Sequence, residues 1–398
     1  MKRIITTGDQ KFSVFESAYG PFFILATVSS LFYMTFWTAF YTFMLRLNFE
    51  NISPTIWHAH EMLFGYAIAV IAGFMLTIEK YRFGAVISKK SALILLIILW
   101  LLARVFISLK LITDISWKTG AILDCLFILI LTIRISYPII RGKDREKAGL
   151  APHLALITAS NIVFYLGVLG VLPDGQRWGV YSALFLVVSL ILLMGRMMIP
   201  LFIRSGLDFN FEPRNWRVID ILSLFFFVSF FIMEIFFASG KLESIISGLL
   251  ALIYTVRLYG WYSNRIWQKP MLWVLFIAYA WIVTGFGLKF LSPYFNIPDL
   301  LAIHSFTYGG IGIMTVGFMS RVTLGHTGRN VFAPPKIVFW LFTVLLGGAV
   351  VRVFFPLLDV GDYGLWIAVS QILWILSFLV FAVGFLPMLW KPRVEIRA

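Results

Sequence analysis

Two histidines and a glutamate stand near the start of an apolar segment that is long enough to cross a membrane. The segment runs from Pro54 to Lys80 and carries His58, His60 and Glu61. An ionisable side chain at the centre of a bilayer costs about 2.5 kcal/mol or more, so such residues face a protein interior and mark functional sites. Imidazole and carboxylate groups together are metal donors, so this position predicts a metal or cofactor site within a helix bundle.

A second segment, residues 298–329, begins with a partial repeat of the first: residues 298–319 align with residues 54–75 without gaps. The shared pattern is P-x5-H-x3-[FY]-G-x7-G-F-M, and it aligns His60 with His304. Two equivalent helices with histidines at one depth could face each other across a flat cofactor. Non-covalent haem fits this arrangement because each imidazole can supply one axial bond. The alternative is that both histidines hydrogen-bond across helices of the bundle.

The prolines and glycines of the repeat have expected structural roles. Pro54 and Pro298 are expected at the first helical position, where proline pre-sets the backbone. The glycines allow close approach, either of a neighbouring helix or of a flat ligand.

His58 lies on a different face from His60 if the helix is regular, because two residues correspond to about 200° of rotation. It then shares a face with Glu61, and Ala302 stands at its place in the repeat. One interpretation is a second metal site on this face, holding copper or another haem. The other is a simple His58–Glu61 pair. A zinc or copper site needs three or four donors, and no spacing in the sequence specifies them.

Basic residues end two of the apolar segments. Arg321, His326 and Arg329 lie in RVTLGHTGR, with His326 expected just past a helix end. They suit an anionic group such as a haem propionate, but basic residues flanking a helix end are the favoured interpretation. Arg196, in GRMMIPLF, is expected to pair with Asp220 or with an acidic group of a ligand.

The composition is that of a polytopic membrane protein. Of 398 residues, 60% are hydrophobic and 13% are charged, a balance that soluble domains do not show. The net charge of +14 does not indicate nucleic-acid binding, because the basic residues fall in short loops between apolar runs. The single cysteine, Cys125, excludes disulfides within the chain, iron–sulfur clusters and the CxxCH attachment of c-type haem.

Apolar runs of about 20 residues predict an all-α integral membrane fold with twelve spans in a single domain, residues 1–398. The spans are approximately 20–46, 56–78, 91–112, 118–140, 150–172, 178–203, 217–239, 243–263, 271–292, 299–321, 336–357 and 363–390. Lysine and arginine concentrate at both termini and in alternate loops, which predicts cytoplasmic termini. In this orientation Arg104 and Asp124 fall in the outer parts of their spans, and Asn161 falls in the inner part of its span.

Several segments resemble the NnrS family of bacterial membrane proteins, which is described as haem- and copper-containing and tied to nitric oxide metabolism and nitrosative stress. They are WHAHEMLFGYAIAVIAGFMLT, GRMMIPLF, LWVLFIAYAWIVTGFGL and HSFTYGGIGIMTVGFMSRVTLGHTGR. The resemblance implies a haem and, as a further expectation, copper. Its motifs carry over to His58, His60, Glu61, His304, Arg321, Gly325, His326 and Arg329. Many members have GGRxIP where this chain has Met194-Gly195-Arg196, a departure that leaves Arg196 in place.

The layout also resembles the catalytic subunit of haem–copper oxidases and nitric oxide reductases. In that fold the low-spin haem lies between histidines on spans two and ten, and His60 and His304 hold these places. The copper-binding histidines of spans six to eight have no counterpart, because no histidine lies between His153 and His304. An oxidase-type dioxygen centre is therefore not expected.

These observations favour a haem-binding inner-membrane protein of the nitric oxide response, with copper as a further expectation and haem held between spans two and ten. The bilayer, nitric oxide and an electron-transfer protein are the expected partners. A secondary transporter is the alternative, since twelve spans and an internal repeat also fit that class. A purely structural or assembly role leaves the histidine cluster unexplained.

Overall fold

The computed structural model describes residues 14, 17–83, 90–140, 149–207, 211–237, 240–358 and 361–391, without the side chains of residues 78–83. Basic residues of the loops at 84–89 and 141–148, on which the orientation prediction partly rests, lie outside these ranges. The chain divides into two compact units. The first is Met1–Leu186 with Phe385–Ala398, and the second is Val187–Gly384. The expectation of a single domain stays a prediction.

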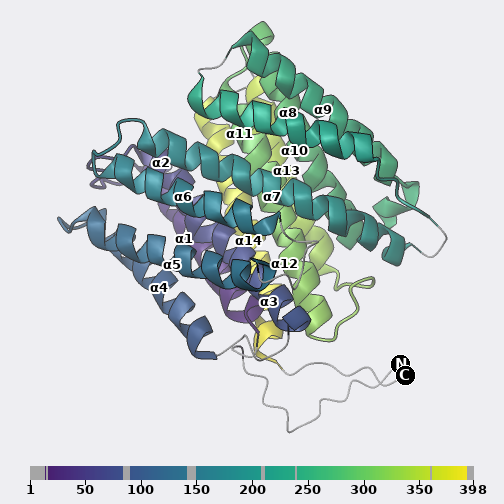
Figure 1. The fold of residues 1–398 in the computed structure, drawn as a ribbon, viewed down its shortest axis with the longest axis horizontal. Coiled ribbons are helices and arrows are strands. Elements are labelled where there is room, and N and C mark those ends of the chain that lie inside the picture. The colour runs from purple at the N-terminus through teal and green to yellow at the C-terminus, as the bar shows by residue number, and fades with distance from the viewer. Residues whose placement is uncertain are drawn as a thin grey trace. The chain divides into compact units, whose positions relative to one another are not determined.

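The described residues form helices and no strand, as the all-α prediction requires (Figure 1). The α-helices are α1 (Tyr19–Phe43), α2 (Pro54–His60), α3 (Ile68–Phe83), α4 (Lys90–Lys110), α5 (Trp117–Pro138), α6 (Leu150–Val168), α7 (Gly175–Gly206), α8 (Arg217–Phe236), α9 (Lys241–Trp261), α10 (Pro270–Phe295), α11 (Asp299–His304), α12 (Ile313–His326), α13 (Ile337–Phe354) and α14 (Tyr363–Trp390). Within the described ranges, twelve helices, counting α2 with α3 and α11 with α12, are long and apolar enough to cross a membrane. They coincide with the twelve predicted spans. The protein is therefore a multi-pass membrane protein.

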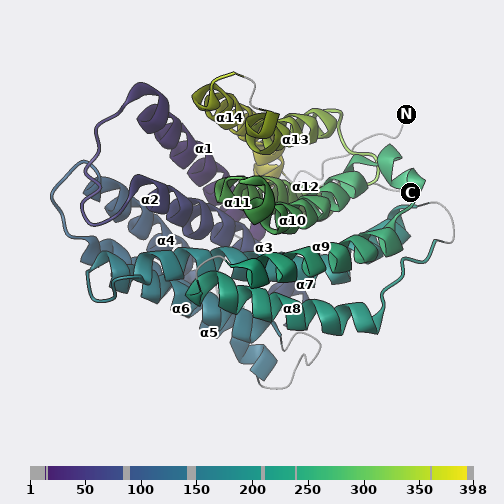
Figure 2. The same cartoon turned by 90° about the horizontal axis from the view of Figure 1, so that it is seen from above.

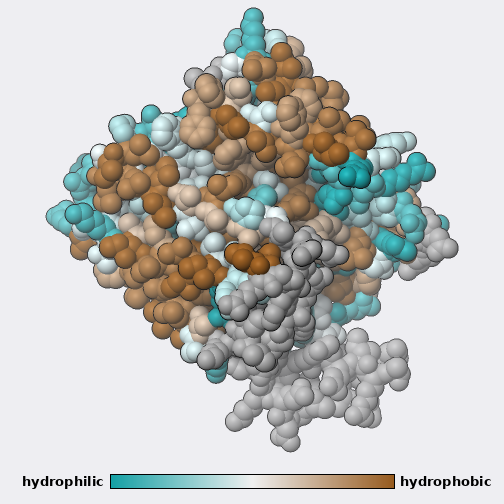
Figure 3. All heavy atoms as spheres, in the orientation of Figure 1, coloured by the Kyte–Doolittle hydropathy of each residue, from teal (hydrophilic) through white to brown (hydrophobic). Residues whose placement is uncertain are grey.

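Apolar side chains cover the outer surfaces of several helices. Figure 3 shows broad hydrophobic patches on one face of the molecule, and on α8 the side chains of Val218, Leu224 and Phe225 are all more than 60% exposed. By contrast, 83% of the apolar stretch in Pro54–Thr77 and 78% of that in Asp299–His326 is buried. The two copies of the sequence repeat are thus interior helices, which is where ionisable residues are tolerated.

Both copies of the repeat contain a π-helical segment directly after the aligned histidine. The segment Glu61–Ala67 follows His60, and Ser305–Gly312 follows His304. Single π-helical turns widen an α-helix and are frequent at functional sites. The regular helix assumed from the sequence is therefore wrong at this point in both copies, because a run of apolar residues carries no signal for an extra residue in one turn.

The aligned glycines pack against the preceding helix in each copy. A Cβ at Gly73 would lie 2.9 Å from Phe22 of α1, and one at Gly317 would lie 2.8 Å from Leu275 of α10. Close helix approach, and not a flat ligand, accounts for these glycines. Pro54 is the first residue of α2, as predicted, whereas Pro298 precedes α11 by one residue.

Neighbouring helices pack as antiparallel pairs within each unit. In the first unit α4 lies beside α5, and α5 contacts α6 (Figures 1 and 2). In the second unit α9 contacts both α8 and α10 (Figure 2). These contacts bring polar residues of separate helices together.

Candidate functional site

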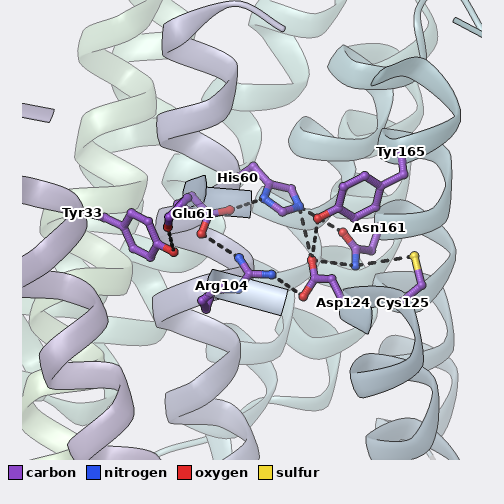
Figure 4. Close-up of polar contacts among 9 residues, drawn as sticks. Tyr33, His60, Glu61, Arg104, Asp124, Cys125, Asn161 and Tyr165 are labelled. Carbon is purple, nitrogen blue, oxygen red and sulfur yellow. Dashed lines mark hydrogen bonds and ion pairs between the residues drawn. The ribbon is translucent and has the colours of Figure 1, made fainter. Parts of the chain in front are cut away.

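A buried polar cluster surrounds His60 in the first unit, and we call it the His60 cluster (Figure 4). Its side chains come from the α2 end and the π-helical segment after it, from α4, from α5 and from α6. All are at most 5% exposed. The members are His60, Glu61, Arg104, Asp124, Asn161 and Tyr165.

Both ring nitrogens of His60 are engaged within this cluster. Nδ1 lies 2.9 Å from the Glu61 carboxylate, and Nε2 lies 3.1 Å from the Asn161 side-chain oxygen. Asn161 in turn donates from its amide nitrogen to Asp124 at 3.2 Å, which accounts for its oxygen facing His60. The ring also stacks on Phe164, with centroids 4.1 Å apart. His60 therefore has no ring nitrogen left for iron in this arrangement.

Arg104 connects the two carboxylates of the His60 cluster. Its guanidinium donates to Glu61 at 2.7 Å and forms an ion pair with Asp124. Tyr165 donates from its hydroxyl to Asp124 at 3.0 Å. Arg104 thus pairs with both buried carboxylates of the cluster, and buried charges are tolerated when they are paired in this way.

The sequence indicates some residues of the His60 cluster but not the contacts between them. Arg104 and Asp124 are charged residues inside apolar spans, which is a recognised sign of a buried site. Asn161 was predicted at a different depth from His60, and that separation is wrong, because its amide contacts the imidazole. No spacing in the sequence pairs residues of four separate helices.

His58 and Glu61 do not form the pair that a regular helix suggested. Glu61 bonds His60 and Arg104 instead. The His58 ring stacks on Trp37 of α1, with centroids 4.5 Å apart and planes 12° apart. Among the residues whose side chains are described, no three His, Cys, Asp or Glu groups are placed to hold a metal ion. Copper at His58 stays a prediction.

His304 has different surroundings from its counterpart. Its Nδ1 lies 2.6 Å from the Leu300 carbonyl one turn earlier, and the ring is partly exposed. Ser305 occupies the place of Glu61 and donates to the Trp281 carbonyl at 2.7 Å. The second copy therefore keeps the histidine and the π-helical segment but replaces the adjacent carboxylate with a hydroxyl. A proton on Nδ1 leaves the lone pair on Nε2, the form in which histidine binds a metal.

Lys289 forms ion pairs with three carboxylates, one of which, Asp299, lies five residues before His304. Its ammonium lies 2.7 Å from Glu234, 3.5 Å from Glu243 and 2.8 Å from Asp299. These residues stand on α8, α9, α10 and the first turn of α11. The ion pairs thus fix the start of the short helix that ends at His304.

Arg196 pairs with Asp220, as one of the two predictions for it required. The contact is bidentate, with Nε donating to the carboxylate at 2.6 Å. Arg257 donates to the same carboxylate at 2.9 Å and to Ser223 at 3.1 Å. Asp220 is therefore shared by two arginines and binds helices of the second unit together.

The segment GHTGR forms a helix end. His326 is the last residue of α12, not the first beyond it, and Gly328 has φ +76°, a conformation that favours glycine. The backbone N–H of Arg329 donates to the Leu324 carbonyl at 2.9 Å, as in a Schellman cap. The geometry supports the favoured interpretation, a basic helix end, for His326 and Arg329. Arg321 lies a turn earlier, with its guanidinium 3.7 Å from the Phe202 ring centre.

The chain was compared with known proteins and with models of protein families. No curated protein matches the chain. A family model described as NnrS protein matches residues 13–393, nearly the whole length. The chain therefore belongs to the NnrS family.

Proposed function

We propose that this protein acts in the bacterial response to nitric oxide, from the inner membrane and with both termini in the cytoplasm, and that it binds non-covalent haem through His304. Family membership supports the first part. The observation that carries the second is the place of His304 in the repeat, directly before a π-helical segment on an interior helix, together with the 2.6 Å hydrogen bond between its Nδ1 and the Leu300 carbonyl. Metal-bound histidines make such a bond through the nitrogen that does not bind the metal, because it fixes the tautomer and the ring orientation.

His60 does not fit as a second axial ligand, because its ring nitrogens contact Glu61 and Asn161. A haem held by His304 alone would supply iron to which nitric oxide could bind. We therefore favour binding of nitric oxide over electron transfer. The role of this chain's residues is to hold the imidazole in place through Leu300 and the Lys289 ion pairs.

The experiment is absorption spectroscopy of protein purified from haem-replete cells. We expect a Soret band in the wild type that shifts when nitric oxide is added to the reduced sample, and we expect His304→Ala to lose the band. His153→Ala is the matched control, because Nδ1 of His153 makes the same contact, 2.6 Å to the Gly149 carbonyl one turn earlier. This control should keep the wild-type spectrum.

Two results would contradict the proposal. A colourless, folded wild-type protein removes haem altogether and favours a transporter. An unchanged Soret band in His304→Ala removes His304 as the ligand while leaving haem binding intact.

Copper on the face of His58 is proposed separately from haem. The stacking of the His58 ring on Trp37 fixes the plane of the ring. The described residues place no group of three His, Cys, Asp or Glu side chains around a metal, so the other copper ligands would have to be donors outside such a group. Metal analysis of His58→Ala should show loss of copper with unchanged haem content. Equal copper in wild type and variant would exclude His58 as a ligand.

A further inference from the structure

Lys289 and its three carboxylates form a second charged cluster, and we call it the Lys289 cluster. The ammonium lies 2.7 Å from Glu234, 2.8 Å from Asp299 and 3.5 Å from Glu243. Asp299 has a side chain that is 50% exposed, whereas the other three side chains are at most 7% exposed. One ammonium cannot balance three ionised carboxylates, and unbalanced charge is costly where water is excluded.

The two buried carboxyl groups of this cluster contact each other. Glu243 on α9 is hydrogen-bonded to Glu234 on α8, the helix beside it. An ionised carboxylate can only accept, so a hydrogen bond between two carboxyl groups contains one proton. Two ionised carboxylates in the same place would repel each other. The contact therefore indicates a proton shared by Glu234 and Glu243, and this proton also removes one of the three negative charges around Lys289.

Other charged side chains at this end of the second unit have other surroundings. The charged groups that act on Glu243 are the other three members of the Lys289 cluster. Lys241, in the first turn of α9, is exposed. Arg352 of α13, a helix that contacts both α10 and α11, donates to the Tyr363 hydroxyl at 3.5 Å. The charge balance of the Lys289 cluster is therefore set by its own four residues.

The position of the Lys289 cluster gives its proton a route to water and a connection to α11. Glu234 lies in the last turn of α8 and Glu243 in the first turn of α9. The loop charges predict that these two helix ends face the outside. Asp299, the half-exposed member, lies in the first turn of α11, the short helix that ends at His304.

We propose that Glu234 and Glu243 form a proton-binding site at the outer end of the second unit, and that their shared proton keeps the start of α11 bound to Lys289. Loss of the proton adds a negative charge beside Lys289, and this charge repels Asp299. Asp299 is the member that moves, because water can solvate its half-exposed carboxylate. The pH outside the membrane then affects the His304 site, a consequence that rests on the proposed function.

The first experiment measures the Tm of the purified full-length protein in detergent from about pH 6 to about pH 9. A folded state that binds more protons than the unfolded state loses stability as the pH rises. We therefore expect the wild-type Tm to fall by several degrees. Glu243→Gln should have a flatter profile and a higher Tm than the wild type at the alkaline end, because its amide donates to Glu234 without a titrating proton. Glu234→Gln should flatten the profile as well, because the two residues share the proton.

Glu50→Gln is the matched control for loss of a glutamate–lysine ion pair. Glu50 lies 2.9 Å from Lys110 in the first unit, and its side chain is 60% exposed. This variant should keep the slope of the wild-type profile. It separates the loss of an ion pair, which also occurs in Glu243→Gln, from the loss of the shared proton.

The second experiment tests the connection to α11 by hydrogen-exchange mass spectrometry. At alkaline pH the backbone amides of residues 299–304 should exchange more slowly in Glu243→Gln than in the wild type, and at acidic pH the two proteins should exchange equally. If Glu243→Gln does not fold, Glu234→Gln takes its place. Both experiments work without haem, so a colourless protein contradicts the proposed function and leaves this test intact.

Three results would overturn the proposal. A wild-type Tm that does not change with pH, or parallel profiles in the wild type and both glutamine variants, would exclude the shared proton. Equal exchange of residues 299–304 in the wild type and Glu243→Gln at alkaline pH would remove the connection to α11.

Discussion

Arg104 balances the buried charges of the first unit. It contacts both Glu61 and Asp124, and all three side chains are at most 6% exposed. Removing one partner of a buried ion pair leaves an uncompensated charge, whereas neutralising the whole group is far less costly. His60 cannot replace Arg104, because its ring already contacts the same carboxylates.

We expect Arg104→Met to lower the free energy of unfolding by about 3–5 kcal/mol, the range for breaking a buried ion pair. The measurement is the unfolding midpoint of the purified protein in detergent. The triple variant Glu61→Gln, Arg104→Met, Asp124→Asn should be more stable than Arg104→Met alone, because it leaves no unpaired charge. A triple variant less stable than the single one would show that Arg104 acts through packing and not through charge.

The repeated helix is the element that organises each unit. In both copies an α-helix ends at the histidine, a π-helical segment follows, and glycines contact the helix that precedes the copy. One of the positions at which the copies differ, Glu61 in the first and Ser305 in the second, changes the contacts of the helix. Glu61 brings His60 into a charged cluster, whereas Ser305 bonds a carbonyl of α10. The same arrangement of histidine and π-helical segment therefore occurs with two different sets of contacts around the histidine.

We expect Gly309→Ala to destabilise the protein by about 1–3 kcal/mol, because excess volume in a packed interior forces neighbouring groups to shift. The added Cβ would lie 2.4 Å from the Trp281 side chain. Gly287→Ala, on the same helix as Trp281, is the control, since nothing lies within 4 Å of its Cβ position. Thermal unfolding of both variants tests this, and equal effects would contradict close packing at Gly309.

At the scale of the molecule, the described residues form twelve helices that are long and apolar enough to cross a membrane, and the charges of the loops predict their orientation. Basic residues flank the odd-numbered spans at their starts and the even-numbered spans at their ends. Because such residues stay on the cytoplasmic side, the loop at Asp174 between α6 and α7 is expected outside.

Reporter fusions measure this orientation. We expect green fluorescent protein fused after Ala398 to fluoresce, and alkaline phosphatase inserted at Asp174 to be active. Alkaline phosphatase inserted at Arg145 should be inactive. The reverse pattern would invert the assignment of both termini while leaving the helix count intact.

The sequence by itself determined the twelve helices, because the length of an apolar run is a local property. A run such as residues 363–390 can be recognised without knowledge of any other part of the chain. It also determined that residues 54–75 and 298–319 are related, and that Arg196 has Asp220 as an available partner.

Only the tertiary structure decided what the histidines contact. Glu61 contacts His60 and Arg104 and not His58. A π-helical segment follows, and periodicity in an apolar run cannot reveal its extra residue. Asn161 and Arg104 reach His60 and Glu61 from separate helices, through contacts that depend on helix packing and not on spacing along the chain. For the same physical reason, His60 and His304 are equivalent in sequence but not in environment.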